Sequence, residues 1–306
     1  MYDLIIIGSG PAGLTAGIYA ERAGLKALVL ERNFMSGGQI IDTYEIDNYP
    51  GLMGINGFDL AQKMREHADQ LGVAFKMAEV QQVEDLGDTK KVHTSEETLL
   101  TKTVLFATGA HHSSLNIPGE AEYAGKGVSY CATCDGAFYK NKDVAVIGGG
   151  NVAIEDAIFL ARTCRKVYVV HRRDQLRAQK ALQDKLFEFD NVEMVWHHTP
   201  VKIVGEDGKT SGLLVHDKSI GTDKCLEVSG VFVAVGIVPN SKGYEHICAC
   251  DQKGYIVAGE DCRTSAPGFF AAGDVRTKEV RQVATAVGDG ANAIASVERY
   301  LNTRKW

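Results

Sequence analysis

The chain opens with Asp3-Leu-Ile-Ile-Ile-Gly8-Ser-Gly10-Pro-Ala-Gly13, an apolar run that ends in a glycine-rich turn. The pattern returns as Asp143-Val-Ala-Val-Ile-Gly148-Gly-Gly150-Asn-Val-Ala153. Residues 3–32 align with residues 143–172 at a constant offset of 140 and without a gap. Each copy predicts an apolar strand, a tight turn, an amphipathic helix and a second apolar strand, which together form a βαβ unit. The repeat therefore predicts an α/β fold with two Rossmann-like dinucleotide-binding domains.

The three small residues of each turn have separate physical tasks. The first glycine allows the tight turn, the second lets the backbone approach a pyrophosphate, and the third position must be small for helix–strand packing. The helix that follows points its amino terminus at the phosphates. A single motif of this kind could be a turn that binds nothing, but two in the same register and context favour nucleotide binding. The three positions are Gly8, Gly10 and Gly13 in the first copy and Gly148, Gly150 and Ala153 in the second.

The two copies differ in the charge of the residue at the end of the second strand. Glu31 stands 23 positions after Gly8, where the adenosine ribose is expected. A carboxylate accepts hydrogen bonds from ribose hydroxyls and repels a 2′-phosphate. The first copy therefore suits FAD or NAD.

His171 occupies the matching position of the second copy and is followed by a basic cluster. Guanidinium groups bind phosphate in a fork, so the cluster suits the 2′-phosphate of NADP(H). Arg172 has a counterpart in Arg32, so the discrimination depends on Arg173, Arg177 and the missing carboxylate. The alternative is a solvated, basic helix start.

A pair of cysteines, Cys131-Ala-Thr-Cys134, ends 14 positions before Gly148. Thiols at this spacing close into a disulfide and open again, so they indicate redox chemistry. The alternative is half of a zinc site, whose other ligands would come from His246 and Cys248-Ala-Cys250. That C-x-C spacing is short for zinc and lies far along the chain, so no metal is expected.

The composition excludes several classes of protein. The 306 residues suit about two domains, and the balance of 45% hydrophobic and 24% charged residues is that of a globular protein. The net charge is −6 without a basic stripe, so nucleic acid is not an expected partner. No run approaches the roughly 18 apolar residues that span a membrane, and the start lacks the basic region of a signal peptide. We therefore expect a cytoplasmic location and no membrane association.

Three further segments could close a flavin site. Thr108-Gly109 follows one apolar strand, and Gly273-Asp274 follows another near the carboxyl end of the chain. The Asp274 carboxylate could hold a ribitol hydroxyl, although such a residue is more often a helix cap. Arg281-Gln282-Val-Ala284 opens a helix that runs to about Tyr300. The positive amino terminus of that helix could stabilise the anionic N1/O2 edge of a reduced flavin.

Together these motifs resemble the low-molecular-weight, bacterial-type NADPH-dependent thioredoxin reductases. The resemblance covers essentially the whole chain, with the motifs in the family's order and spacing. It implies two Rossmann-like domains, with the NADPH domain inserted into the FAD domain. The motifs are Gly8-Ser-Gly-Pro-Ala-Gly13, Gly37-Gly38-Gln39, Cys131-Ala-Thr-Cys134-Asp135-Gly136, Gly148–Ala153, His171-Arg-Arg-Asp-Gln-Leu-Arg177 and Phe270-Ala-Ala-Gly-Asp274.

The resemblance sets the expected domain limits. Residues 1–113 and 243–306 would form the FAD-binding domain, and residues 118–239 would form the NADPH-binding domain that carries the dithiol. The linkers would lie near His111–Pro118 and Val238–Gly243, where polar stretches with proline and glycine fit a boundary. The resemblance also implies a homodimer.

The implied activity is that of a thioredoxin-disulfide reductase. Electrons would pass from NADPH to FAD, then to the Cys131–Cys134 disulfide, and finally to thioredoxin or a thioredoxin-like protein. Cys134 would face the flavin, Cys131 would attack the partner's disulfide, and Asp135 would be the general acid and base. Because nicotinamide and disulfide share one domain, that domain would rotate about the linkers to present each in turn.

The resemblance also carries over a set of cofactor contacts. For FAD they are Gly8, Gly10, Pro11, Ala12, Gly13, Glu31, Gly38, Gln39, Asn48, Thr108, Gly109, Gly273, Asp274, Arg281, Gln282 and Ala284. For NADPH they are Gly148, Gly150, Asn151, Ala153, His171, Arg172, Arg173 and Arg177.

Other redox classes share part of this pattern. An FAD dithiol oxidase that passes electrons to oxygen, or a ferredoxin-fed reductase, would keep the cysteine pair but would not need the arginines at 172, 173 and 177. A flavin electron-transfer or NADPH sensor module would not need the segment Cys131–Asp135. The sequence therefore favours the NADPH-dependent reductase over these alternatives.

Overall fold

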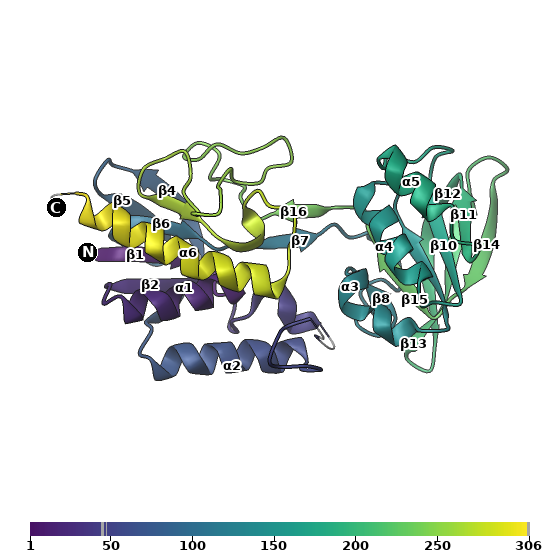
Figure 1. Ribbon diagram of the computed structural model, residues 1–306, viewed down its shortest axis with the longest axis horizontal. Coiled ribbons are helices and arrows are strands. Elements are labelled where there is room, and N and C mark those ends of the chain that lie inside the picture. Colours follow the sequence, from purple (N-terminus) through teal and green to yellow (C-terminus); the bar gives the residue numbers. More distant parts are fainter. Residues whose placement is uncertain (44–45, 47, 305–306) are drawn as a thin grey trace. The chain divides into compact units, whose positions relative to one another are not determined.

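A computed structural model describes residues 1–43, 46 and 48–304. Lys305 and Trp306, at the end of the expected FAD-binding domain, lie outside the described residues. The chain divides into two compact units (Figure 1). Unit 1 is formed by Met1–Thr43, Asp47–His111 and Val238–Trp306, and unit 2 consists mainly of His112–Ile237.

Unit 1 is built on one sheet of seven strands. They are β1 (Tyr2–Ile7), β2 (Ala27–Glu31), β3 (Phe75–Met77), β4 (Val80–Asp85), β5 (Lys90–Thr94), β6 (Thr98–Phe106) and β17 (Phe269–Ala271). The order is β3-β2-β1-β6-β5-β4, and β17 also pairs with β6. The neighbours of β1 run parallel to it, so Leu4 lies opposite both Ala27 and Thr103. Parallel strands end at the same edge, which brings their carboxyl-terminal turns together.

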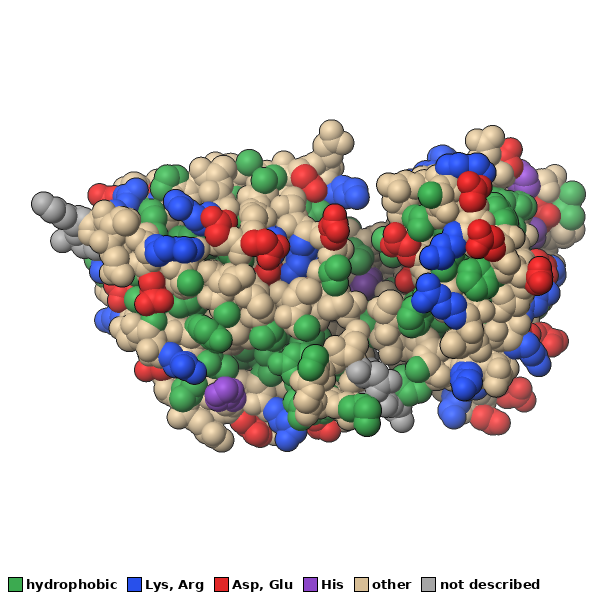
Figure 2. Space-filling view, in the orientation of Figure 1, with side chains coloured by type: hydrophobic (Ala, Val, Ile, Leu, Met, Phe, Trp, Pro, Cys, Tyr) green, Lys and Arg blue, Asp and Glu red, His purple; other side chains and the backbone are tan. Residues whose placement is uncertain are grey.

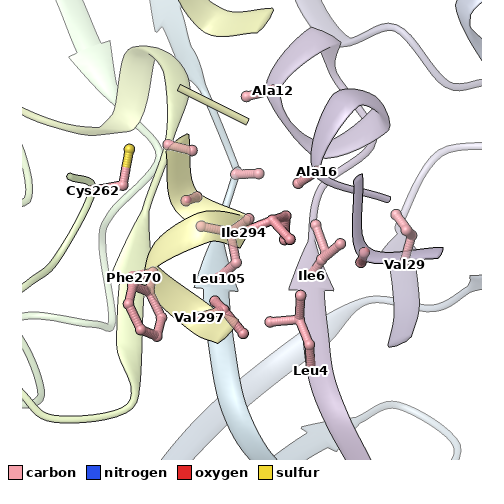
Figure 3. Close-up of a cluster of buried hydrophobic side chains, with 14 of the residues drawn as sticks. Leu4, Ile6, Ala12, Ala16, Val29, Leu105, Cys262, Phe270, Ile294 and Val297 are labelled. Carbon is pink, nitrogen blue, oxygen red and sulfur yellow. The ribbon is translucent and has the colours of Figure 1, made fainter. Parts of the chain in front are cut away.

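Alternate residues of β1 serve two separate cores, as expected of a strand covered on both faces. Helices α1 (Pro11–Arg22) and α6 (Val283–Asn302) pack against each other over one face. Figure 3 shows Leu4 and Ile6 on that side, near Ile294 of α6. Ile5 and Ile7 belong to the cluster on the opposite face.

The remaining elements of unit 1 are short or peripheral. They are η1 (Gly38–Asp42), α2 (Gly57–Gln70), β7 (Ala110–His112), β16 (Ile237–Pro239) and η3 (Gly273–Val275). Asn56 caps α2, since its side chain accepts a hydrogen bond of 2.7 Å from the Asp59 amide. Strands β7 and β16 pair with each other, at the two points where the chain crosses between the units.

Unit 2 contains a parallel sheet and a smaller sheet of three strands. Its elements are β8 (Val128–Ser129), α3 (Ala132–Asp135), η2 (Gly136–Tyr139), β9 (Asp143–Ile147), α4 (Asn151–Ala161), β10 (Lys166–His171), α5 (Lys180–Leu186), β11 (Val192–Trp196), β12 (His198–Glu206), β13 (Lys209–Asp217), β14 (Thr222–Glu227) and β15 (Gly230–Val233). The parallel sheet has the order β11-β10-β9-β15-β8. Val144 and Val146 of β9 pack with α4, whereas Ala145 and Ile147 pack with β12–β14.

The predicted repeat is confirmed in both units. The strand, turn, helix and second strand appear as β1–α1–β2 and again as β9–α4–β10, within one or two residues of the expected limits. The helix expected to run to about Tyr300 is α6. Strands β12–β14, which cover the back of the unit 2 sheet, were not predicted.

Two glycines of α6 provide a test of this packing. A Cβ on Gly290 would lie 2.5 Å from the Ala12 carbonyl oxygen of α1, whereas a Cβ on Gly288 meets nothing within 4 Å. We expect Gly290→Ala to destabilise the protein by ~1–3 kcal/mol through overpacking. Gly288→Ala should stabilise it by ~0.5–1 kcal/mol, because alanine favours the helix. Scanning calorimetry measures both, and equal shifts in Tm would contradict the close contact between α1 and α6.

Candidate active site

In the first glycine turn, two glycines lie where a side chain would clash with the backbone, and the third lies where a side chain would not clash. Gly8 has φ +102°, and a Cβ there would lie 2.5 Å from the Ala107 carbonyl oxygen. A Cβ on Gly13 would lie 1.9 Å from the Gly8 carbonyl oxygen. Gly10 is different, since the nearest atom to its Cβ position is the Gly37 oxygen at 3.8 Å. The turn is closed where the protein packs and open at the position expected to face a pyrophosphate.

Glu31 is tied to this turn by direct hydrogen bonds. Its Oε2 accepts from the Ser9 amide at 2.9 Å and from the Ser9 hydroxyl at 2.8 Å. Its Oε1 accepts from the Asn33 amide at 2.9 Å. These donors fix the carboxylate at the end of β2, where the sequence predicts the ribose. Ser9 could not be predicted as its partner, because the two residues are 22 positions apart.

Asp274 supplies an unpaired carboxylate oxygen inside unit 1. Its Oδ1 is buried and has no hydrogen-bond partner among the described residues. Burial raises the pKa of Asp274, and the charges of Lys278 and Arg281 oppose that effect. The Arg281 Nε is also buried and lacks a hydrogen-bond partner within the part of the chain that the structure describes, and its guanidinium lies 3.9 Å from the centre of the Tyr255 ring. These free polar atoms fit a polyhydroxylated ligand such as the ribitol of FAD.

The turn that carries Asp274 is held by a buried ion cluster that the sequence did not predict. Asp289 of α6 accepts from the Gly273 amide at 2.8 Å and binds Arg276 through two bonds of 2.8 and 2.6 Å. Lys278 adds a third partner at 2.9 Å. Burial raises the pKa of Asp289, but these cations outweigh it and hold the pKa below its ordinary value. Asp289 therefore stays ionised and fixes the turn to α6.

The other expected FAD contacts lie around the same turns. Asn48 donates to the Gln282 Oε1 at 3.0 Å, and Gln282 caps α6. Gly38 has φ +62° and follows Gly37, whose amide donates to the Ser9 oxygen at 2.8 Å. The Thr108 hydroxyl donates to the Asn240 oxygen at 2.7 Å, so that group is already partnered. Pro11, Ala12, Gln39, Gly109 and Ala284 belong to the same set, and their cofactor roles remain predictions.

The second glycine turn is closed by His171. Its ring lies 2.3 Å from the position that a Cβ on Gly149 would take, so only glycine fits there. The histidine is buried, and its Nε2 lies 3.1 Å from the Gln175 carbonyl oxygen. Burial, and then the charges of Arg177, Arg172 and Arg173, lower its pKa. His171 is therefore neutral at pH 7 and adds no positive charge to the cluster.

Three arginines near the second turn carry positive charge. Arg172, Arg173 and Arg177 are exposed. The Arg177 amide donates to the Gly149 oxygen at 2.7 Å, which joins the basic segment to the glycine turn. The Asn151 Oδ1 accepts from the Gln179 amide at 2.9 Å and makes a second link. Gly150 has no atom within 4 Å of its Cβ position, so this turn also fits a phosphate group.

Cys131 and Cys134 form a disulfide in unit 2, with their Cα atoms 5.3 Å apart. Both side chains are partly exposed at the start of α3. Asp135 ends α3, and its Oδ2 accepts from the Ser129 hydroxyl at 2.6 Å. Burial raises the pKa of Asp135, and the Ser129 bond offsets part of that rise. The disulfide is therefore followed directly in the chain by a half-buried carboxyl group whose pKa is raised.

The other cysteines show no sign of chemistry. Among the described residues, no group of three or more histidines, cysteines or acids could hold a metal ion. Cys164, Cys248 and Cys262 are buried, and burial raises their pKa values to about 11, 11 and 12. Cys225 is exposed. Thiolates are the reactive form, so the buried three are unreactive near pH 7.

The surface charge is mixed on the face that Figure 2 shows, where lysine and arginine side chains are interspersed with acidic ones. Across the described residues, no helix is both long enough and apolar enough to cross a bilayer.

Comparison with known proteins identifies the class. Residues 2–290 match the family model described as pyridine nucleotide-disulphide oxidoreductase. The chain therefore belongs to that family.

The individual relatives narrow the assignment. A thioredoxin reductase of Listeria monocytogenes is 44% identical over 305 residues, which cover 100% of this chain and 95% of the relative. A crystal structure of thioredoxin reductase from Streptococcus pyogenes is 45% identical, with a TM-score of 0.94 and 99% of both chains covered. That of Lactococcus lactis, in an FR conformation, is 42% identical, with a TM-score of 0.69 over 99% and 100% of the two chains. The resemblance to low-molecular-weight thioredoxin reductases is confirmed.

Thiol counting tests the disulfide directly. Five of the seven cysteines are free, and the other two are joined. Protein denatured without reductant should therefore react with DTNB at five thiols, and at seven after reduction. In the native oxidised protein, the exposed Cys225 should react first. Seven thiols before reduction would show that the Cys131–Cys134 bond is absent.

Proposed function

We propose that the protein reduces thioredoxin, or a thioredoxin-like protein, with electrons from NADPH that pass through FAD and the Cys131–Cys134 disulfide. One observation carries the proposal: the disulfide lies in the same unit as the second glycine turn, to which a segment with three exposed arginines is hydrogen-bonded. Gly136 directly follows α3, and a Cβ built on it would lie 2.9 Å from the Phe159 ring of α4. The dithiol segment therefore packs on the helix whose amino terminus faces the expected phosphates.

The FAD site is proposed at the carboxyl edge of the unit 1 sheet. When bound, FAD supplies two-electron chemistry between the nicotinamide and the disulfide. The open backbone at Gly10 would receive the pyrophosphate, and the fixed carboxylate of Glu31 would accept from the ribose hydroxyls. The free Oδ1 of Asp274 would accept from the ribitol, which gives a partner to an otherwise unpaired buried atom.

The NADPH site is proposed at the matching edge of unit 2. Gly148, Gly150 and the amino terminus of α4 would bind the pyrophosphate. Arg173 and Arg177 would bind the 2′-phosphate, with Arg172 beside them. An oxidase or a ferredoxin-fed reductase has no use for such a cluster, so the exposed arginines weigh against both alternatives.

The dithiol chemistry is divided among three neighbouring residues. Cys134 is proposed to face the flavin, and Cys131 to attack the partner's disulfide. Asp135 is proposed to give and take the proton at the sulfur atoms, because burial brings its pKa toward the working range. A thiolate is the attacking species, so control of this proton controls the exchange.

Four expectations extend this proposal. The FAD-binding domain is residues 1–113 with 243–306, and the NADPH-binding domain is residues 118–239. The second rotates against the first, so that nicotinamide and disulfide reach the flavin in turn. The protein is a homodimer and is cytoplasmic. At similar identity, the two structures of relatives give TM-scores of 0.94 and 0.69, which supports a family with more than one domain arrangement.

Anaerobic spectroscopy with a matched variant tests the function. NADPH should bleach the flavin absorbance, and oxidised thioredoxin should restore it. Cys134→Ser should still be bleached by NADPH but should lose thioredoxin reduction, because the disulfide cannot form. Cys225→Ser, an exposed cysteine outside the dithiol, is the control and should behave like the parent protein. Absence of bleaching, or thioredoxin reduction by Cys134→Ser, would contradict the proposal.

Replacement of two arginines tests the nucleotide preference. Arg173→Ala with Arg177→Ala should raise the KM for NADPH by at least about 10- to 100-fold and change the KM for NADH little, since the loss of even one charged hydrogen bond of ~1.5–3 kcal/mol corresponds to a factor of that size. Arg165→Ala is the control. Its guanidinium is exposed in the same unit but binds Asp143 at the start of β9, away from the carboxyl ends of the strands. An equal change for both nucleotides would contradict recognition of the 2′-phosphate.

A further inference from the structure

Ser129 is a buried residue beside the dithiol, and the sequence did not single it out. It ends β8, which pairs in parallel with β15, so that Ser129 lies opposite Phe232. Only 4% of its surface is exposed. The residue is therefore fixed by the sheet, whereas Cys131 and Asp135 lie beyond it on the dithiol segment.

The Ser129 hydroxyl connects the two reactive residues. Its Oγ accepts from the Cys131 amide at 3.1 Å and lies 2.6 Å from Asp135 Oδ2 and 3.3 Å from the Cys131 oxygen. A hydroxyl has one hydrogen to donate, and the shorter, charge-assisted bond to the carboxylate is the stronger. Ser129 thus receives a bond from the Cys131 backbone and gives one to Asp135.

The two oxygens of Asp135 have unequal surroundings. Oδ2 is bound by Ser129, whereas Oδ1 is buried and has no partner among the described residues. A buried oxygen of this kind is costly unless it serves a purpose. With Oδ2 occupied, a proton that reaches the carboxylate is placed on Oδ1.

The other groups around Asp135 do not take over this task. Tyr139 of η2 feels the Asp135 charge, but mainly burial raises its pKa to about 12, so it stays protonated. Helix α4 packs on this segment through Phe159 and Leu160, which are apolar. Asp156, one turn earlier on α4, has a pKa raised to about 7 by burial and by Glu155, but Asp135 has no part in that shift, and the described residues show no hydrogen bond between Asp156 and Asp135 or the dithiol. Ser129 is the hydrogen-bond donor to Asp135 among the contacts of the described residues.

We propose that Ser129 is a positioning residue, which holds Asp135 through Oδ2 and thereby assigns proton exchange with the dithiol to Oδ1. The inference rests on the proposed acid–base function of Asp135. When two electrons from NADPH cleave the S–S bond, the two sulfur atoms take up two protons. One comes from Asp135 Oδ1, and the other is the proton that the NADPH hydride brings with its two electrons. When the dithiol is oxidised by a partner's disulfide, Oδ1 takes one proton back from the dithiol, and the partner's two sulfur atoms take up the other dithiol proton and one proton from water.

The pH dependence of alkylation tests this role without relying on turnover. In holoenzyme reduced by NADPH under nitrogen, the rate at which iodoacetamide alkylates Cys131 reports its thiolate fraction, and mass spectrometry follows it. The ionisation of Asp135 should appear as an inflection in that profile. Ser129 stabilises the ionised carboxylate, so Ser129→Ala should move the inflection upward by about one pH unit.

Two variants separate positioning from a structural effect. Ser129→Thr keeps the hydroxyl and should restore the parent inflection. Thr210→Ala removes another buried hydroxyl of unit 2, one without a hydrogen-bond partner among the described residues, and should leave the inflection in place. A shift in Thr210→Ala, or no shift in Ser129→Ala, would overturn the inference.

A double-mutant cycle distinguishes this inference from the function on which it rests. Asp135→Asn should abolish the inflection, and adding Ser129→Ala should then change nothing further. An inflection that persists in Asp135→Asn would refute the proposed role of Asp135 itself. An inflection lost in Asp135→Asn but unmoved by Ser129→Ala would leave that role standing and refute only the positioning by Ser129.

Discussion

The close approach of the first helix to its own glycine turn is the constraint on which unit 1 depends. The position of a Cβ on Gly13 coincides nearly with the Gly8 oxygen, at 1.9 Å. Only glycine lets α1 start so near the end of β1, and this placement brings α1 onto α6 and leaves Gly10 open. In unit 2 the third small residue of the motif is Ala153 instead of glycine. There the residue that must be glycine is Gly148, because a Cβ on it would lie 2.6 Å from the Ala153 Cβ. One backbone geometry therefore produces two open glycine turns, one in each unit.

The two copies differ in charge at the same structural position. Glu31 is held by Ser9 and presents a carboxylate, whereas His171 is buried under Gly149 and neutral. In unit 2 the positive charge lies on the exposed arginines that follow His171. The backbone of one of them, Arg177, is hydrogen-bonded to the glycine turn. The shared fold thus sets the position of each turn, and the side chains beside the turn set its charge.

The periodic pattern of the sequence was sufficient to predict the strands and helices of the repeat. Leu4–Ile7 and Val144–Ile147 each precede a glycine turn, and both became strands because local pattern and tertiary packing agree. The supporting contacts were not predictable. Asp289 reaches Arg276 across 13 positions, and Ser129 reaches Asp135 through a turn, without any periodic pattern. Such partners depend on the path of the backbone, which spacing alone does not specify.

We place the Cys131–Cys134 disulfide on the electron path from NADPH. Anaerobic titration of the holoenzyme with NADPH, followed by a thiol count, tests this placement. The flavin and the disulfide each take up two electrons, so full bleaching should require a second equivalent of NADPH, and two new thiols should appear. Complete bleaching after one equivalent, with no new thiols, would show that the disulfide lies off the path.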